Sequence, residues 1–155
     1  MVQTKCGFND SPGVSGCDLL VAYGPTISVS IGFDPNFDPK PGSIPIAGIQ
    51  NVEALVDSGA SQSCIDSLLA SQLSLPIIDK QQISGVGGQH EANIYMAQIY
   101  VPALASVIYG TFAGVHLQAG GQWHKALLGR SFLRHFTMIY EGDTGTVTIS
   151  SATQK

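Results

Sequence analysis

The fold of this chain is decided by residues 54–61, which read ALVDSGAS. The apolar run Ala-Leu-Val predicts a buried strand, and the glycine at position 59 permits a sharp turn directly after it. Between them lies Asp57, so the strand delivers a carboxylate to a tight turn. Such a carboxylate is costly to bury unless another group shares its proton or donates a hydrogen bond to it. The stretch therefore predicts that Asp57 has a partner.

The composition of the whole chain indicates one compact, β-rich domain. Its 155 residues are enough for a single core. Charged residues make up only 12% and hydrophobic residues 44%, which argues against disorder. The net charge of −4 and the lack of any basic cluster argue against a nucleic-acid-binding protein. We therefore expect no nucleic-acid partner.

The cysteines and histidines lack the spacing of a disulfide framework or a metal site. Cys6, Cys17 and Cys64 form no close pair, so we expect free thiols in a reducing compartment. The histidines are scattered, and we expect neither a metal ion nor another cofactor. They are His90, His116, His124 and His135. The N-terminus lacks the basic start and apolar core of a signal peptide, so we expect a cytoplasmic protein.

One apolar stretch, residues 99–115, approaches the length of a membrane span. Pro102, Gly110 and Gly114 interrupt it, and it is rich in β-branched and aromatic residues. These features predict two consecutive strands. We expect no membrane segment in this chain.

Local patterns predict the remaining elements. Apolar and polar residues alternate in residues 26–31, which predicts a half-buried strand. The prolines of residues 33–42 predict a long loop. Residues 66–73 predict a short helix with an aspartate N-cap. The polar, turn-rich start predicts a flexible arm (1–16) before a single domain (17–155). Other expected elements are strands at residues 93–101, 107–118 and 126–129, a helical turn at 131–135, and a hairpin formed by 136–140 and 146–150.

Three segments, taken in order, resemble the retropepsin family. They are residues 54–60 (ALVDSGA), 83–88 (ISGVGG) and 127–133 (LLGRSFL). Retropepsins are the single-domain aspartic proteases of retroviruses and of their cellular and bacterial relatives, and the predicted helix is more similar to the cellular and bacterial branch. The resemblance extends over about residues 19 to 150. It implies a mostly β fold: a closed acid-protease barrel with one or two short helices and a flap hairpin.

The resemblance also implies roles for single residues. Asp57 matches the catalytic aspartate, and Ser58 and Gly59 are expected to support it. The glycine-rich segment matches the flap that covers a bound peptide, since glycine permits positive φ and opening. The flap residues are Gly85, Val86, Gly87 and Gly88. We also expect Ala60 and Leu127 in the substrate pocket.

A second triplet of the same type, Asp-Thr-Gly, occupies residues 143–145. It follows Glu-Gly, not an apolar strand, which is typical of a β-hairpin turn. The second carboxylate is therefore expected from Asp57 of another copy, because a twofold axis brings identical residues together. We predict a homodimeric aspartic endopeptidase in which two Asp57 carboxylates activate a water to cleave extended peptide segments.

Three alternatives stay open at this stage. The chain could be a catalytically silent retropepsin-like module for dimerisation or peptide binding. It could pair Asp57 with Asp143 within one chain. A cysteine hydrolase built on Cys64 is the weakest, because no histidine has a convincing place beside it.

Two further side chains have open roles. Viral retropepsins place an acidic residue at the position of Ser61, where it pairs with the arginine that matches Arg130. That acid is missing here, so Arg130 is expected to pair elsewhere or to remain solvated. Trp123 is expected at the rim of the pocket, in the core or at an interface.

Overall fold

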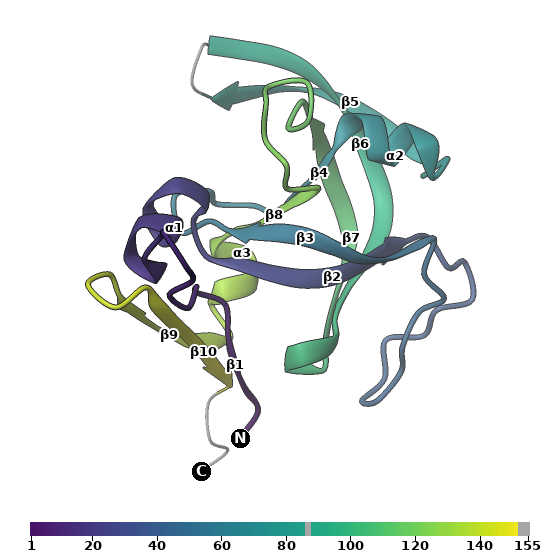
Figure 1. The fold of residues 1–155 in the computed structure, drawn as a ribbon. Helices are drawn as coiled ribbons and strands as arrows, with labels where there is room; N and C mark the ends of the chain where they lie inside the picture. The colour runs from purple at the N-terminus through teal and green to yellow at the C-terminus, as the bar shows by residue number, and fades with distance from the viewer. Residues whose placement is uncertain (86–87, 152–155) are drawn as a thin grey trace.

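Strands dominate the computed structural model, which describes residues 1–85 and 88–151 (Figure 1). The strands are β1 (Gln3–Lys5), β2 (Thr26–Gly32), β3 (Ile49–Val56), β4 (Cys64–Asp66), β5 (Ile77–Gly85), β6 (Gly88–Val101), β7 (Ser106–Val115), β8 (Ala126–Leu128), β9 (Phe136–Glu141) and β10 (Thr146–Ser151). The helices are α1 (Gly16–Tyr23), α2 (Ser67–Gln72), α3 (Arg130–Leu133) and the 3-10 turn η1 (Pro102–Leu104). The prediction of a mostly β fold is confirmed.

The larger sheet closes on itself. Its strand order is β2-β3-β8-β4-β7-β6-β5, and β2 also pairs with β6, for example at Ser30 and Tyr100. This extra pairing converts an open sheet into a barrel. The pairings β3–β8 and β4–β7 are parallel and bring together segments that are distant in the chain. The predicted closed barrel is confirmed.

The first 16 residues differ from the flexible arm expected for them. Gln3–Lys5 form β1, which pairs with β10 in a second sheet of order β1-β10-β9. The next residue, Cys6, is only 2% exposed, and its carbonyl accepts a hydrogen bond from Thr26 N at 2.8 Å. The polar side chains favoured a loose segment, but strand pairing is made by the backbone, which every residue carries.

Helix α1 is an element that no pattern in the sequence predicts. Ser15 caps it, because its Oγ accepts a hydrogen bond from Asp18 N at 3.0 Å. Only Gly16 and Leu20 are buried in this helix, while Val21 is 80% exposed. The helix therefore lacks the repeating apolar stripe on which helix prediction depends.

A long hairpin of β5 and β6 lies at the top of Figure 1, at the opposite end from the small sheet. Gly85 pairs with Gly88 at its described end. Val86 and Gly87, which we predicted as part of the flap, lie outside the described residues. Strand β5 begins at Ile77, eight residues before Gly85.

The turn between β9 and β10 is the predicted hairpin. Thr144 N and Gly145 N both donate hydrogen bonds to Glu141 O, at 3.2 Å and 3.1 Å. Asp143 lies within this turn, so its carboxylate does not follow a buried strand as that of Asp57 does. Residues 57–59 thus follow a buried strand, whereas residues 143–145 belong to a hairpin turn.

Replacing Gly145 by Ala is expected to destabilise the protein more than replacing Gly42 by Ala. Both glycines have positive φ, +80° and +83°, where alanine costs about 1–2 kcal/mol. A Cβ at Gly145 would also overlap the backbone of Gly16 and lie 2.8 Å from Cys17 N, whereas a Cβ at Gly42 meets nothing within 4 Å. Urea unfolding measures the difference as a shift of the midpoint. Equal midpoints would contradict the packing of α1 on this turn.

Two further predictions are confirmed within the described residues. Residues 99–115 belong to β6, η1 and β7, so the apolar stretch consists of two strands joined by a helical turn. Cys6, Cys17 and Cys64 are free. In the part of the chain that the structure describes, no helix is both long and apolar enough to cross a bilayer.

Candidate active site

Asp57 is the first residue after β3. Its backbone N–H donates to Leu128 O at 2.9 Å, and the N–H of Val56 donates to Pro25 O at 2.8 Å. The end of β3 is thus held by β8 on one side and by the segment before β2 on the other. The side chain of Asp57 is only half-buried, so its carboxylate remains accessible to solvent.

The turn that follows holds one oxygen of this carboxylate. Asp57 Oδ1 accepts a hydrogen bond from Gly59 N at 2.8 Å, and Ala60 N donates to Asp57 O at 3.2 Å. A Cβ on Gly59 would lie 3.0 Å from Oδ1, so glycine permits the close approach. Within residues 1–85 and 88–151, the second oxygen, Oδ2, accepts no hydrogen bond. One oxygen is therefore oriented and the other is available.

Four half-buried side chains form a row beside Asp57. Thr26 pairs with Leu55 across β2 and β3. Leu55 pairs with Leu127 across β3 and β8, and Leu127 pairs with Cys64 across β8 and β4. Directly paired residues point to the same face of a sheet, so these four share one face. Asp57 follows Leu55 by two positions and continues this face. We call Thr26, Leu55, Leu127 and Cys64 the Leu55 row.

The alternate residues of the same strands face the core. Val56, Leu128 and Ile65 are each at most 4% exposed, whereas the Leu55 row is half-buried. Three of the four residues in the row are apolar or weakly polar. A largely apolar surface next to a free carboxylate oxygen suits a ligand that combines apolar side chains with a polar backbone.

The thiol of Cys64 is not activated. Burial, and to a smaller extent the negative charge of Asp57, together raise the pKa of this thiol to about 11. A thiol with this pKa is protonated at neutral pH and is a poor nucleophile. The cysteine-hydrolase alternative thus loses its chemical basis.

Arg130 pairs with the backbone of the Asp57 turn. Its Nη1 donates to Ser58 O at 2.8 Å, and its backbone N–H donates to Ala60 O at 2.8 Å. The missing acid at Ser61 is therefore replaced by a carbonyl of the turn. Before it, a Cβ on Gly129 would lie only 2.6 Å from Gln62 O. This close approach explains the glycine in the LLG segment.

Two buried polar residues, Asp66 and Ser63, make long-range hydrogen bonds that the sequence did not predict. Asp66 is 1% exposed, and its Oδ1 accepts hydrogen bonds from Leu117 N at 3.1 Å and Gln118 N at 3.0 Å. Its Oδ2 also caps α2, as predicted, by accepting from Leu69 N at 3.1 Å. Ser63 is 5% exposed and accepts from Gly129 N at 3.1 Å. Local sequence gave no sign of these long-range bonds.

The structure brings part of the predicted site together. Asp57, Ser58, Gly59 and Ala60 form the turn, and Leu127 lies in the Leu55 row beside it. The described flap residues lie instead at the end of the β5–β6 hairpin, and within residues 1–85 and 88–151 no hydrogen bond joins them to the turn. They are Gly85 and Gly88.

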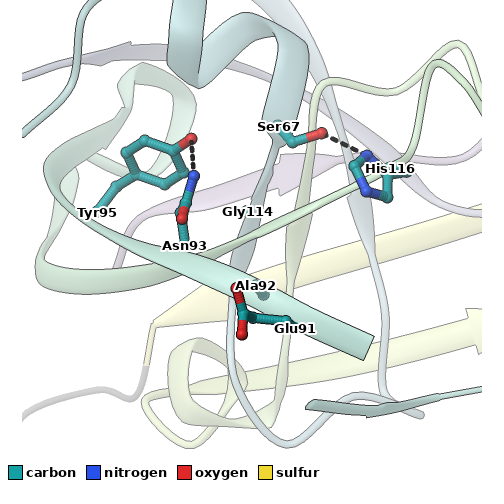
Figure 2. Close-up of a pocket in the computed structure, with 7 residues that line it drawn as sticks. All are labelled: Ser67, Glu91, Ala92, Asn93, Tyr95, Gly114 and His116. Atoms are coloured by element: carbon teal, nitrogen blue, oxygen red, sulfur yellow. Dashed lines mark hydrogen bonds between the residues drawn. The ribbon is translucent and has the colours of Figure 1, made fainter. Parts of the chain in front are cut away.

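Two pockets of the described chain lie away from Asp57. Figure 2 shows the first, with a volume of about 100 Å³, between β6, β7 and the start of α2. In it the Ser67 hydroxyl and His116 Nδ1 are 2.8 Å apart, and Asn93 Nδ2 donates to Tyr95 Oη at 3.4 Å. The second pocket is formed by the loop after β2 and the start of β7. Among residues 1–85 and 88–151, no cluster of histidine, cysteine and acidic side chains could hold a metal ion.

Residues 43–135 match the family model described as gag-polyprotein putative aspartyl protease. The chain belongs to this aspartyl protease family. The matched region begins before β3, contains the Asp57 turn and the β5–β6 hairpin, and ends just after α3. Membership in this family supports a protease function, and the resemblance to retropepsins is confirmed.

Solved structures of retropepsin-like proteases are similar to this aspartyl protease family member. The retropepsin-like aspartic protease from Rickettsia conorii has 13% sequence identity and a TM-score of 0.51, covering 95% of this chain and 89% of that chain. The EIAV protease in complex with the inhibitor HBY-793 has 21% identity and a TM-score of 0.46, covering 71% and 85%. The Rickettsia protein supports the retropepsin-like fold. No curated protein sequence matches this chain.

Proposed function

We propose that this chain is one subunit of a homodimeric aspartic endopeptidase, with Asp57 of each copy contributing one carboxylate to a shared catalytic centre. The observation that carries the proposal is the arrangement of Asp57 itself. Its backbone is held on both sides of β3, one carboxylate oxygen is oriented by Gly59 N, and the other accepts no hydrogen bond from the part of the chain that the structure describes. The Leu55 row provides apolar surface directly beside it.

The reaction needs two carboxylates and one shared proton. Two like charges in contact cannot both ionise at low cost, so one carboxylate keeps a proton while the other accepts one. The ionised group takes a proton from a water that attacks the scissile carbonyl carbon. The protonated group donates to the carbonyl oxygen, and a proton is then delivered to the leaving amine. The C–N bond breaks and two peptide fragments are released.

The residues around Asp57 have supporting roles in this proposal. Gly59 orients the carboxylate, and Arg130 holds the turn through Ser58 O. Ser58 is an exposed residue, and in this proposal its hydroxyl binds the second copy. Ala60 and Leu127 line the substrate site.

An extended peptide is the substrate that suits such a site. An extended chain offers backbone hydrogen bonds along its length and places alternate side chains on one face. The β5–β6 hairpin, with the flap residues Gly85, Val86, Gly87 and Gly88, would cover the bound peptide. The apolar side chains of the peptide would lie on the Leu55 row.

The dimer is tested by dilution. We expect the peptidase rate per chain to be constant while the dimer dominates, and to fall in proportion to concentration once monomers dominate. The mass measured by analytical ultracentrifugation should decrease from that of a dimer to that of a monomer over the same range of concentrations. A constant rate per chain at concentrations where the mass is that of a monomer would contradict the shared centre.

A further inference from the structure

The pocket shown in Figure 2 lies on the opposite face of the sheet from the Leu55 row. Cys64, the last residue of that row, pairs with Ala113 on β7, and Ala113 pairs with Ile94 on β6. These two residues therefore continue the face of the row. Asn93 and Gly114, which line the pocket, are adjacent to them in the chain and belong to the other face. The sheet thus separates the pocket from the proposed substrate site.

Gly114 creates the space of this pocket. A Cβ at this position would lie 2.6 Å from Tyr95 Cε2 and 3.6 Å from Asn93 O, so any other residue would push on the tyrosine ring and fill the hollow. The pocket has a volume of about 100 Å³. One water molecule needs only about 10–15 Å³. The pocket is therefore large enough for a group of several non-hydrogen atoms.

The pocket is lined by polar groups with unused hydrogen-bonding capacity. Ser67 Oγ lies 2.8 Å from His116 Nδ1, and Asn93 Nδ2 donates to Tyr95 Oη at 3.4 Å (Figure 2). Within residues 1–85 and 88–151, Asn93 Oδ1 accepts no hydrogen bond. Over the same residues, the carboxylate of Glu91 forms neither a hydrogen bond nor an ion pair. Two acceptor oxygens, one of them charged, thus lack a donor from the described chain.

We propose that this pocket binds a cationic nitrogen group, an ammonium or a guanidinium. Such a group is carried by a Lys or Arg side chain of a polypeptide, or by a free small amine. Its N–H groups would donate to the carboxylate of Glu91 and to Asn93 Oδ1, and hydrogen bonds between charged partners are the stronger ones. The site goes beyond the proposed function, because neither Asp57 nor the Leu55 row takes part in it.

The lining of the pocket favours a cation over the other small polar ligands. No lysine or arginine is among the described residues that line it, so an anion would meet Glu91 without a compensating charge. A divalent metal ion would find one imidazole, that of His116, and one carboxylate, which is fewer than the usual set of protein ligands. A guanidinium suits the pocket best, because its planar fork of N–H donors reaches two acceptors at once.

An NMR titration of the isotope-labelled full chain tests the site, with methylguanidinium as the probe. We expect saturable shifts of the backbone amide signals of Glu91, Asn93 and His116. Tetramethylammonium is the matched control probe, because it has the same charge and no N–H donor. It should shift these signals little at the same concentrations. Equal shifts with both probes would mean that the protein responds to charge alone, and would overturn the proposal.

Two variants test the acceptors. Glu91→Gln should weaken methylguanidinium binding about tenfold, the lower end of the range for a hydrogen bond to a charged group. Asn93→Ala should weaken it by a smaller factor, about threefold. The matched control is Glu141→Gln, which removes the same charge from an exposed residue at the end of β9 and should bind the probe as wild type does. Unchanged affinity in both Glu91→Gln and Asn93→Ala would overturn the site.

A third variant separates this site from the proposed catalytic centre. The carboxylate of Asp57 could also attract a cation, so Asp57→Asn should bind methylguanidinium with wild-type affinity. Loss of binding in Asp57→Asn would place the probe at Asp57 and overturn the proposal. The titration does not depend on catalysis, so a wild type that cuts no peptide would end the proposed function and leave this result intact.

The source of the cation is decided by a second probe, a blocked glycine peptide with one central Arg. Binding of this peptide at least as tight as that of methylguanidinium would identify a polypeptide side chain as the ligand. Binding of methylguanidinium alone would identify a free small amine. If neither probe shifts the signals of the pocket residues, the proposal is wrong.

Discussion

Replacing Asp57 by Asn should reduce kcat/KM for peptide cleavage by about 10³-fold or more, because general acid–base catalysis by such groups contributes about 10²–10⁴-fold. Asn keeps the size of the side chain and can still accept the hydrogen bond from Gly59 N. It cannot take a proton from water or hold one for the carbonyl oxygen. The fold and the unfolding midpoint should therefore change little. A fluorogenic peptide assay with purified protein measures the rate.

The matched control for this variant is Asp143→Ala. Asp143 lies in the β9–β10 turn, and its triplet does not follow a buried strand. Wild-type activity in Asp143→Ala would support the two-copy centre. Loss of activity in that variant, together with cleavage by monomers, would instead support a single-chain pair of Asp57 and Asp143.

Mixing wild type with Asp57→Asn extends this prediction. If each centre needs Asp57 from two copies, a ninefold excess of the variant should trap most wild-type chains in mixed dimers. Activity per wild-type chain should then fall about tenfold once subunits have exchanged. A monomeric enzyme would keep its full rate. Full activity in the mixture would therefore contradict the shared centre, and a variant as active as wild type would remove Asp57 from catalysis.

Replacing Asp66 by Ala is expected to be the most destabilising change among the polar residues discussed here. Asp66 is 1% exposed and accepts hydrogen bonds from three backbone N–H groups, those of Leu69, Leu117 and Gln118. A buried donor without a partner costs about 1–3 kcal/mol, so the loss should be about 3 kcal/mol or more. Chemical denaturation with a far-UV CD readout measures it.

Two variants make this prediction sharper. Asp66→Asn keeps one carbonyl oxygen and should fall between wild type and Asp66→Ala. Asp34 also binds backbone N–H groups, those of Asn36 at 2.9 Å and Ile46 at 3.0 Å, but it is half-buried in a loop. Water can replace those bonds, so Asp34→Ala should cost about 1 kcal/mol or less. Equal losses in Asp34→Ala and Asp66→Ala would contradict the role of burial.

Several parts of the site were predictable because their signals are local. The ALVDSGAS stretch reads as strand, carboxylate and turn within a few residues, and glycine suits position 59 because a Cβ there would lie only 3.0 Å from Asp57 Oδ1. The hairpin around Asp143 was predictable for the same reason, since turn residues are selected by backbone conformation. The N-cap of α2 likewise depends on neighbours in sequence.

Other parts were not predictable because their partners lie far away in the chain. Gln3–Lys5 is polar and short, and it becomes a strand only because β10 pairs with it. Asp66 has the sequence of a helix cap, but two of its three bonds go to the segment after β7. Arg130 has no acidic partner at position 61 and donates instead to Ser58 O. A backbone carbonyl carries no sequence signal, so this partner could not be predicted.

Periodicity and residues that permit tight turns were enough to define the strand and turn of the Asp57 segment, the mostly β class and the hairpins. That Thr26, Leu55, Leu127 and Cys64 form one face beside Asp57 is visible only once the strands are paired. This face depends on strand register, because a shift by one residue would turn it toward the core, and register is set by packing between distant segments.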